Sequence, residues 1–252
     1  MIDVDRARAD TPGSQSRTHL DNARASLMPL PVLAAMQQQL ELEAQVGSAE
    51  AAEQQADAIE RAYRSTAALL NADPTEITIY SGGSLDLMTQ AEPHVVDVSP
   101  SIGRTPIDVQ ALDRPAVVAS AGSYLRGPAG AGILVLRGGR RARVSPSPAV
   151  VLGLGRAIEY AEEWGVSAIG ARVDALAASL HSDLEVLPGV SARRDDGVIV
   201  FEIAARDPRD VAWALRKRGI TVGLNGKGVR VSPHYFNTEH ELEQLAATVR
   251  DL

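Results

Sequence analysis

Four small residues in a row, Ser81-Gly82-Gly83-Ser84, form the first group in this sequence whose spacing could do chemistry. They follow the apolar run Ile77–Tyr80, which predicts a strand, and precede an apolar stretch from Leu85 that predicts a helix start. Backbone N–H groups at a helix start are unpaired, and the helix dipole favours negative charge there. Such a turn can therefore bind an anion such as a phosphate. An ordinary strand-to-helix turn is the alternative.

Two glycine-rich stretches look like nucleotide-binding loops but lack the context of one. Gly127, Gly130 and Gly132 precede a predicted strand, whereas a dinucleotide fingerprint follows a strand and opens a helix. The stretch 223–228 has neither the spacing nor the Ser/Thr of a phosphate-binding loop, and it also runs into a strand. The sequence therefore favours a nucleotide site at neither place.

Residues that could hold a metal or a covalent cofactor are scarce. Cysteine is absent, which removes disulfides, thiolate metal sites and a catalytic cysteine. His234, His240 and Glu241 could be drawn as a metal cluster, but a solvated helix start explains them better, because a site needs three or four converging ligands. Of the 25 basic residues, only Lys217 and Lys227 are lysines.

The composition bounds the class of protein. A chain of 252 residues with 45% apolar content can bury a core in one or two domains. Its net charge of -7 is spread out, and no basic stripe is interleaved with aromatics, so nucleic acid is not an expected partner. No apolar run approaches a membrane span, and the first residues, MIDVDRARAD, lack the features of a signal peptide. We expect a cytoplasmic protein.

The apolar periodicity predicts an alternation of helices and strands. Helices are expected over about 29–46, 49–70, 149–183 with an interruption near Gly165, from Pro208 onward, and at the C-terminus behind a capping box of Thr238 and Glu241. Strands are expected at 77–80, 94–98, 116–120, 132–137, 190–203 with a hairpin turn at 195–197, 220–224 and 229–232.

These elements predict two layered domains. Residues 1–17 are polar and are expected to form a flexible N-terminal arm. An α/β domain is expected over 18–148 and a smaller α+β domain over 149–252. The strands of the first domain are apolar without alternation, which predicts a parallel sheet covered on both faces.

Five ordered segments resemble the class V aminotransferases. This branch of the fold-type-I pyridoxal phosphate (PLP) enzymes includes cysteine desulfurases, isopenicillin-epimerase-like proteins and C–S lyases. The matching segments are Thr18–Ala23 with Leu27–Pro29, Asn71–Gly82, Asp97 with Ile102-Gly103 and Pro106–Val109, Leu125–Pro128 with Gly130 and Gly132, and Arg230–Thr238. The resemblance implies a reduced fold-type-I large domain followed by an α+β small domain.

The resemblance also implies a role for each matched position. The positions implied to contact the cofactor phosphate or ring are Gly82, Gly83, Ser84, Asp97 and Ser120. Asp97 would keep the pyridine nitrogen protonated, so that the ring can accept electrons. Arg230 would hold a substrate carboxylate with two parallel hydrogen bonds.

Two substitutions depart from the family pattern. The family's Schiff-base lysine immediately precedes an aromatic residue and Leu-Arg-Gly-Pro, and here that position is Ser123, before Tyr124. A hydroxyl cannot form the covalent link to the cofactor aldehyde or carry the proton of the reaction. The glutamine usually found three residues after the pyridine aspartate is Pro100, which has no hydrogen-bond donor.

A deletion reinforces these substitutions. Between Met88 and Pro93 the family has several βα units, including the residue that stacks on the cofactor ring, and here they are absent. The linker 138–148 is short and lacks the Gly-Thr element with which a neighbouring subunit closes the family's phosphate site. We therefore expect no cofactor, or PLP only if it is held noncovalently.

The leading hypothesis is a pseudoenzyme: a non-catalytic subunit that pairs with itself or with a full-length class V relative, because a narrowed sheet leaves apolar surfaces to cover. The alternative is an enzyme acting on a small amino-acid-like carboxylate. It would work without PLP, through a remnant pocket of Asp97, Ser120, Ser123, Tyr124 and Arg230, or by residual desulfurase or C–S lyase activity. A decayed gene product with no selected role is the last possibility that the sequence leaves open.

Overall fold

The computed structural model describes residues 2–82, 95–138 and 146–252, and its contacts divide the chain into two compact units. The central unit is Met28–Val166, and the terminal unit combines Met1–Leu27 with Ser167–Leu252. These boundaries differ from the expected ones at 17 and 148. The first 27 residues belong with the C-terminal part, and the helix that follows residue 147 belongs with the central unit.

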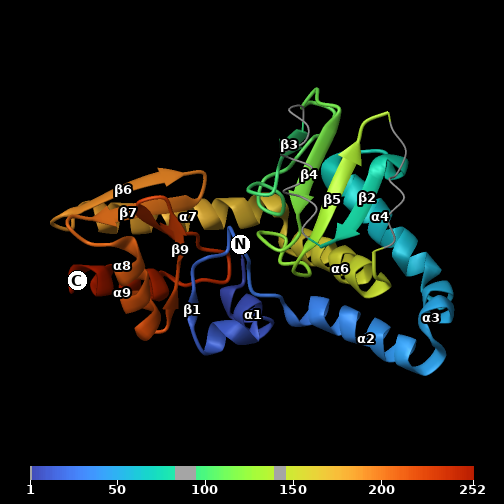
Figure 1. Ribbon diagram of the computed structural model, residues 1–252, viewed down its shortest axis with the longest axis horizontal. Helices are drawn as coiled ribbons and strands as arrows, with labels where there is room; N and C mark the ends of the chain where they lie inside the picture. Colours follow the sequence, from blue (N-terminus) through green and yellow to red (C-terminus); the bar gives the residue numbers. More distant parts are fainter. Residues whose placement is uncertain (1, 83–94, 139–145) are drawn as a thin grey trace. The chain divides into compact units, whose positions relative to one another are not determined.

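The central unit is a four-stranded sheet with helices. Its helices are α2 (Leu30–Val46), α3 (Ser48–Gln54), α4 (Ala56–Leu70) and α6 (Pro148–Trp164), with a short 3-10 helix at Pro74–Glu76. Its strands are β2 (Ile77–Ser81), β3 (Val95–Asp97), β4 (Ala116–Ser120) and β5 (Ala131–Leu136). Helix α6 packs against both α2 and α4 (Figure 1). The single helix expected over 49–70 is two helices, because the chain leaves helical geometry at Gln55.

The sheet of the central unit is mixed, so the expectation of a parallel sheet was wrong. The strand order is β2-β5-β4-β3, in which β5 runs antiparallel to both of its neighbours while β3 and β4 are parallel. A parallel connection needs a crossover of about a dozen residues or more. Only residues 121–130 join β4 to β5, and this short connection sends β5 back antiparallel.

The terminal unit is an antiparallel sheet with three helices of ten residues or more. Its strands β6 (Val190–Asp195), β7 (Val198–Ile203), β10 (Gly228–Val231) and β9 (Gly223–Asn225) lie in the order β6-β7-β10-β9. Its helices are α7 (Val166–Glu185), α8 (Pro208–Lys217) and α9 (Glu239–Arg250). The expected hairpin turn is confirmed: Asp196 and Gly197 have φ of 43° and 79°, the left-handed pair that two-residue hairpins need. The capping box of Thr238 and Glu241 is also confirmed.

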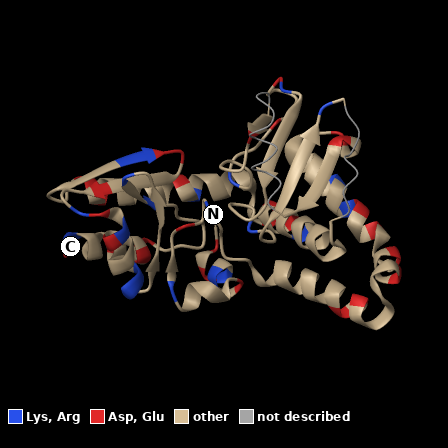
Figure 2. Ribbon diagram, viewed as in Figure 1, with Lys and Arg blue, Asp and Glu red and all other residues tan. Residues whose placement is uncertain are grey.

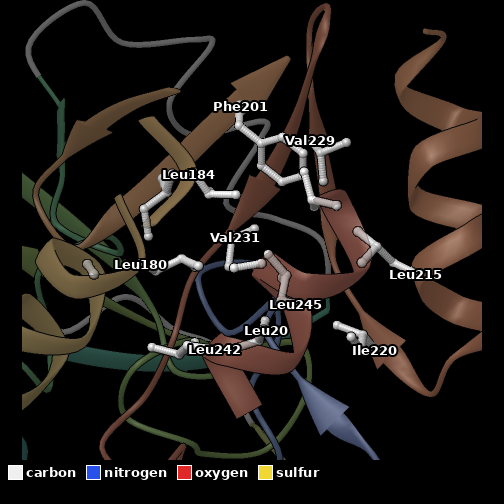
Figure 3. Close-up of a cluster of buried hydrophobic side chains, with 14 of the residues drawn as sticks. Leu20, Leu180, Leu184, Phe201, Leu215, Ile220, Val229, Val231, Leu242 and Leu245 are labelled. Carbon is white, nitrogen blue, oxygen red and sulfur yellow. The ribbon is translucent and has the colours of Figure 1, made fainter. Parts of the chain in front are cut away.

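The N-terminal residues are folded into the terminal unit. Strand β1 (Thr18–His19) pairs in parallel with β8 (Ile220–Thr221), and Asp21 forms a parallel bridge with Ser232. Leu20 is fully buried in the core of this unit, where it lies near Leu242 and Val231 (Figure 3). Two sequence-distant ends therefore build one hydrophobic core.

The segment expected to be a loose arm begins with helix α1 (Val4–Ala9), followed by a 3-10 turn at Pro12–Gln15. Arg8 holds this segment in place, because its guanidinium lies 3.0 Å from the Glu241 carboxylate and also donates to the carbonyls of Phe236 and Ser14. The polar sequence predicted a flexible arm, because Glu241, the partner of Arg8, lies more than two hundred residues away and leaves no trace in the local sequence pattern. Within the part of the chain that the structure describes, no helix is both long and apolar enough to cross a membrane.

We predict that Arg8→Ala destabilises the protein by about 1–3 kcal/mol, the usual loss for a hydrogen bond to a charged, largely buried group. The substitution leaves the Glu241 carboxylate, which is 8% exposed, without its cationic partner. Urea unfolding measures the loss, and limited proteolysis should show faster cleavage within the first 20 residues. The exposed Arg17 supplies the control variant, Arg17→Ala. Equal stability and equal cleavage of the two variants would show that Arg8 does not anchor this segment.

Candidate functional site

The structure brings three of the predicted site residues to one edge of the central sheet. Gly82 directly follows β2, Asp97 ends β3 and Ser120 ends β4. These three strands run in the same direction, because β5 is antiparallel to both β2 and β4. Their carboxyl ends therefore share an edge, which is where α/β sheets bind ligands.

Asp97 and Ser120 also share one face of the sheet. Asp97 is registered opposite Val118, two residues before Ser120 on the neighbouring strand, and side chains two apart on a strand point to the same face. Tyr80 fills this face beside them. A Cβ on Gly132, which pairs with both Tyr80 and Ser120, would lie 2.2 Å from the Tyr80 ring carbon Cζ. The ring therefore lies flat over the glycine.

Ser99 connects the predicted residues at this edge. Its backbone N–H donates to the Asp97 carboxylate at 2.8 Å, and its hydroxyl accepts the backbone N–H of Ser120 at 2.7 Å. Its carbonyl accepts the hydroxyl of Ser123 at 3.1 Å. One residue thus binds the end of β3 to the end of β4 and to the turn beyond it. The sequence analysis missed Ser99, although Asp-x-Ser after a strand is a signal for a side-chain-capped turn.

Ser123 lies in a buried turn rather than an open pocket. Ser123 is 2% exposed and Tyr124 is 1% exposed, and the Arg104 guanidinium carbon lies 4.9 Å from the centre of the Tyr124 ring. Gly103, with φ of 86°, lets the two segments touch, since a Cβ there would be 2.8 Å from the backbone of Tyr124 and Leu125. The turn that follows Ser123 is therefore packed closely against the segment that contains Gly103.

The predicted phosphate turn is described only at its first residues. The Gly82 N–H donates to the carbonyl of Gly130 at 3.0 Å, so this amide is already used within the sheet edge. Gly83 and Ser84 lie outside the described residues, as does the stretch from Met88 to Pro93 at which the resemblance implied a deletion.

Arg230 belongs to the terminal unit and is paired there. Its Nη2 lies 2.7 Å from Oδ1 of Asp21, and both side chains are largely buried. Gly223 permits this pair, because a Cβ at that position would lie 2.4 Å from the same Asp21 oxygen. Arg230 and Asp21 line a pocket of about 780 Å³ together with residues of α8 and of the chain from Thr221 to Leu224. Asp21 was not predicted as the partner of Arg230, because 209 residues separate the two.

The ring of His19, two residues before Asp21, has a lowered pKa. Burial lowers its pKa below the ordinary value, and this effect outweighs the hydrogen bond to the Ala25 carbonyl and the charge of Asp21, which raise the pKa. Its Nε2 donates to the Ala25 carbonyl at 2.8 Å. The lowered pKa disfavours a positive charge beside the Arg230–Asp21 pair.

The three residues that could be drawn as a metal cluster have separate roles. Glu241 closes the capping box of α9, and His240 is exposed on its first turn, as expected of a helix start. His234 is not solvated: it is fully buried, and its Nδ1 accepts the N–H of Tyr235 at 2.8 Å. Among the described residues no group of three or more His, Cys, Asp or Glu could hold a metal ion.

The cofactor that the resemblance implies does not fit the residues present at the sheet edge. Covalent attachment of PLP requires an amine, and the implied lysine position holds the Ser123 hydroxyl, which is buried and bonded to Ser99. The amide of Gly82 is bonded within the sheet, and the Asp97 carboxylate is exposed and caps its own turn. Among the described residues, the hydrogen bonds at this edge are made within the protein itself.

Comparisons with known proteins agree with the resemblance read from the sequence. The family model described as "Aminotransferase class-V" matches residues 139–250. A probable cysteine desulfurase of Methanothermobacter thermautotrophicus is 24% identical over 210 residues, covering 63% of this chain and 52% of the relative. A cysteine desulfurase of Synechococcus elongatus is 28% identical over 204 residues, covering 62% of this chain and 32% of the relative. The chain thus spans about half or less of these curated relatives.

Solved structures share the fold at low sequence identity. The apo cysteine desulfurase of Thermococcus onnurineus NA1 aligns with a TM-score of 0.83 and 17% identity, over 100% of this chain and 98% of that chain. A variant of C-DES that lacks a lysine, with glycine covalently linked to its PLP cofactor, aligns with a TM-score of 0.84 and 15% identity, over 97% of this chain and 99% of that chain. The expected fold-type-I α/β architecture is confirmed.

We predict that Ser99→Ala costs about 1–3 kcal/mol of stability, because it leaves the Ser120 N–H without its acceptor. Ser101→Ala is the matched control. Ser101 lies two residues away and is half-buried, and its hydroxyl makes no hydrogen bond in the described part of the chain. Urea unfolding of both variants should show a loss of less than about 0.5 kcal/mol in the control. An equal effect of both substitutions would mean that the Ser99 hydroxyl does not hold the two strand ends together.

Proposed function

Because this chain belongs to the class V aminotransferase and cysteine desulfurase-like family, we propose that it is a non-catalytic member that acts by pairing with other chains. It is a pseudoenzyme that pairs with itself or with an intact relative. The observation that carries this proposal is the buried hydroxyl of Ser123 at the position implied for the Schiff-base lysine.

The positions of the two lysines support the loss of PLP chemistry. Lys217 ends helix α8 and Lys227 follows strand β9, so both belong to the terminal unit, whereas Ser123 belongs to the central unit. The ammonium group of Lys217 lies 3.5 Å from the centre of the Trp213 ring, in a cation–π contact. No lysine is present anywhere in the central unit to replace the missing amine.

An exposed apolar stripe on α2 supports the pairing. Leu30, Leu33 and Leu40 are 43%, 40% and 51% exposed. Leu33 and Leu40 are two helical turns apart and Leu30 one turn before Leu33, so the three lie on one side of the helix. The other side, which includes the buried Val32, is the one that meets the core. Leucines on an exposed helical stripe mark a surface that another chain covers.

A second candidate function is the binding of a small carboxylated metabolite through Arg230. The observation that favours it is the position of this arginine on the wall of a pocket of about 780 Å³, a volume within the range of small-molecule sites. Such binding is compatible with a protein that does no PLP chemistry, because it uses only side chains of the terminal unit.

We predict that the 252-residue chain neither shifts the absorption band of added PLP nor retains PLP after dialysis. Reduction with borohydride followed by peptide mass spectrometry should find no saturable pyridoxyl adduct on Lys217 or Lys227. The titration is repeated with glycine present, because a C-DES variant in which one lysine is replaced by alanine has glycine covalently linked to its PLP cofactor. An intact cysteine desulfurase is the positive control. A saturable band or adduct, with or without glycine, would contradict the proposal.

We also predict that the double variant Leu33→Glu with Leu40→Glu no longer associates with itself or with a full-length relative, while its fold is unchanged. Two carboxylates on the stripe oppose its burial, because an unpaired charge is costly to remove from water. Sedimentation velocity of the chain alone, and co-purification with a full-length relative, measure association, and circular dichroism checks the fold. Leu112→Glu with Val186→Glu is the control, since it adds the same charge at apolar positions that are 36% and 78% exposed elsewhere. A wild-type chain that neither self-associates nor binds the relative would contradict pairing.

A further inference from the structure

The pocket of the terminal unit carries an unusual local charge. Four arginines line it, Arg24, Arg209, Arg216 and Arg230, against one carboxylate, Asp21. The wall of this pocket therefore has a surplus of three positive charges, although the whole chain has a net charge of -7. A concave surface of one sign raises the local concentration of ligands of the opposite sign.

Helix α8 presents two of these arginines by its register. Arg209, Ala212, Trp213 and Arg216 stand at positions i, i+3, i+4 and i+7, which lie on one side of a helix. The opposite side buries Val211 and Leu215 in the core, so packing fixes the side that lines the pocket. Figure 2 shows basic positions concentrated toward the end of α8.

The arginines of the pocket are not neutralised by the protein. Within residues 2–82, 95–138 and 146–252, the guanidinium groups of Arg24, Arg209 and Arg216 have no carboxylate within 4.0 Å. Arg230 has one ion pair, with Asp21, while its Nε is buried and makes no hydrogen bond. Arg24, Arg209 and Arg216 are exposed, so solvent weakens the repulsion between them, and an anion that enters the pocket relieves what remains of it.

We propose that this pocket binds a small molecule with at least two anionic groups, carboxylate or phosphate. Planar guanidinium groups form paired hydrogen bonds with both kinds of oxyanion. A single carboxylate would leave most of the charge surplus in place, since Arg230 is already paired with Asp21. Trp213, which is 59% exposed, supplies an apolar wall for the part of the ligand between its anionic groups. This proposal deepens the second candidate function by adding three arginines and a ligand class.

The test measures binding to the full chain by titration calorimetry with three probes. Citrate carries several carboxylates, pyrophosphate several phosphate charges, and acetate one carboxylate. We expect citrate or pyrophosphate to bind at least about tenfold more tightly than acetate, with an affinity that falls as salt is added. Preference for citrate over pyrophosphate, or the reverse, identifies the anionic group of the natural ligand.

Matched variants assign the binding to the pocket. Arg209→Gln with Arg216→Gln should weaken binding of the preferred probe at least about tenfold, because charge-assisted hydrogen bonds are lost. Arg193→Gln with Arg194→Gln is the control, since it removes the same charge from the exposed strand β6 of the same unit. Thermal unfolding of each variant without ligand shows that the fold is retained.

Four outcomes would overturn the proposal. Equal affinities for acetate and the multivalent probes would reject a ligand with two anionic groups. So would a loss of binding in Arg230→Gln that is not seen in the double variant of α8. Either result would leave the second candidate function, binding through Arg230, in place. If the control variant of β6 weakens binding of the probe as much as the α8 variant does, the probe is attracted to the protein's positive charge without a specific site. Binding of hexaglutamate without binding of citrate or pyrophosphate would assign the pocket to an acidic peptide. The proposed pairing through α2 is unaffected by any of these results.

Discussion

The hydrogen bonds made by Ser99 are the constraint on which the central unit depends. In a parallel pair of strands the carboxyl ends carry free polar groups that a ligand could use. Here the protein uses these groups itself. The Ser99 hydroxyl accepts the backbone N–H of Ser120 at the end of β4, and its carbonyl accepts the hydroxyl of Ser123. The Ser99 N–H donates to the Asp97 carboxylate. A buried group that is satisfied internally gains little from a ligand, because the ligand must replace a bond that already exists. A serine at position 123 fits this role. A lysine there would place a charged group in a buried turn, where water does not solvate it.

Local chemistry made much of the fold predictable from sequence. Proline and glycine marked the ends of α2, Asp207-Pro208 the start of α8, and Asp196-Gly197 the hairpin, since each acts through its own backbone geometry. The errors came from information that is not local. The prediction of a parallel sheet was wrong because an apolar strand sequence does not show the direction of the strand. Strand β5 runs antiparallel to β4 because only ten residues connect the two, too few for a parallel crossover. The first 17 residues were expected to be loose because the carboxylate that binds Arg8 is Glu241.

The candidate site shows the same limit. Motif order placed Gly82, Asp97 and Ser120 in one family pattern, and the topology brings them to one edge of the sheet. The pattern did not reveal what each group is bonded to. Asp97 caps a turn and Gly82 donates to Gly130, and neither contact could be read from spacing alone. Asp21 lies inside a segment that the resemblance singled out, yet its partner Arg230 became visible only when β10 and the N-terminal segment met in space.

The two units thus differ in how far their polar groups are satisfied, and that difference decides where a ligand can gain free energy. At the edge of the central sheet, among the residues that the structure describes, Ser99 forms hydrogen bonds with Asp97, with the backbone N–H of Ser120 and with the hydroxyl of Ser123. In the terminal unit the helix register of α8 leaves guanidinium groups facing a cavity that holds a single carboxylate. Uncompensated charge of one sign at a concave surface is the usual physical basis of anion recognition. Recognition of an anion by arginines does not depend on a lysine, so the proposed ligand site of the terminal unit is independent of the residue at position 123.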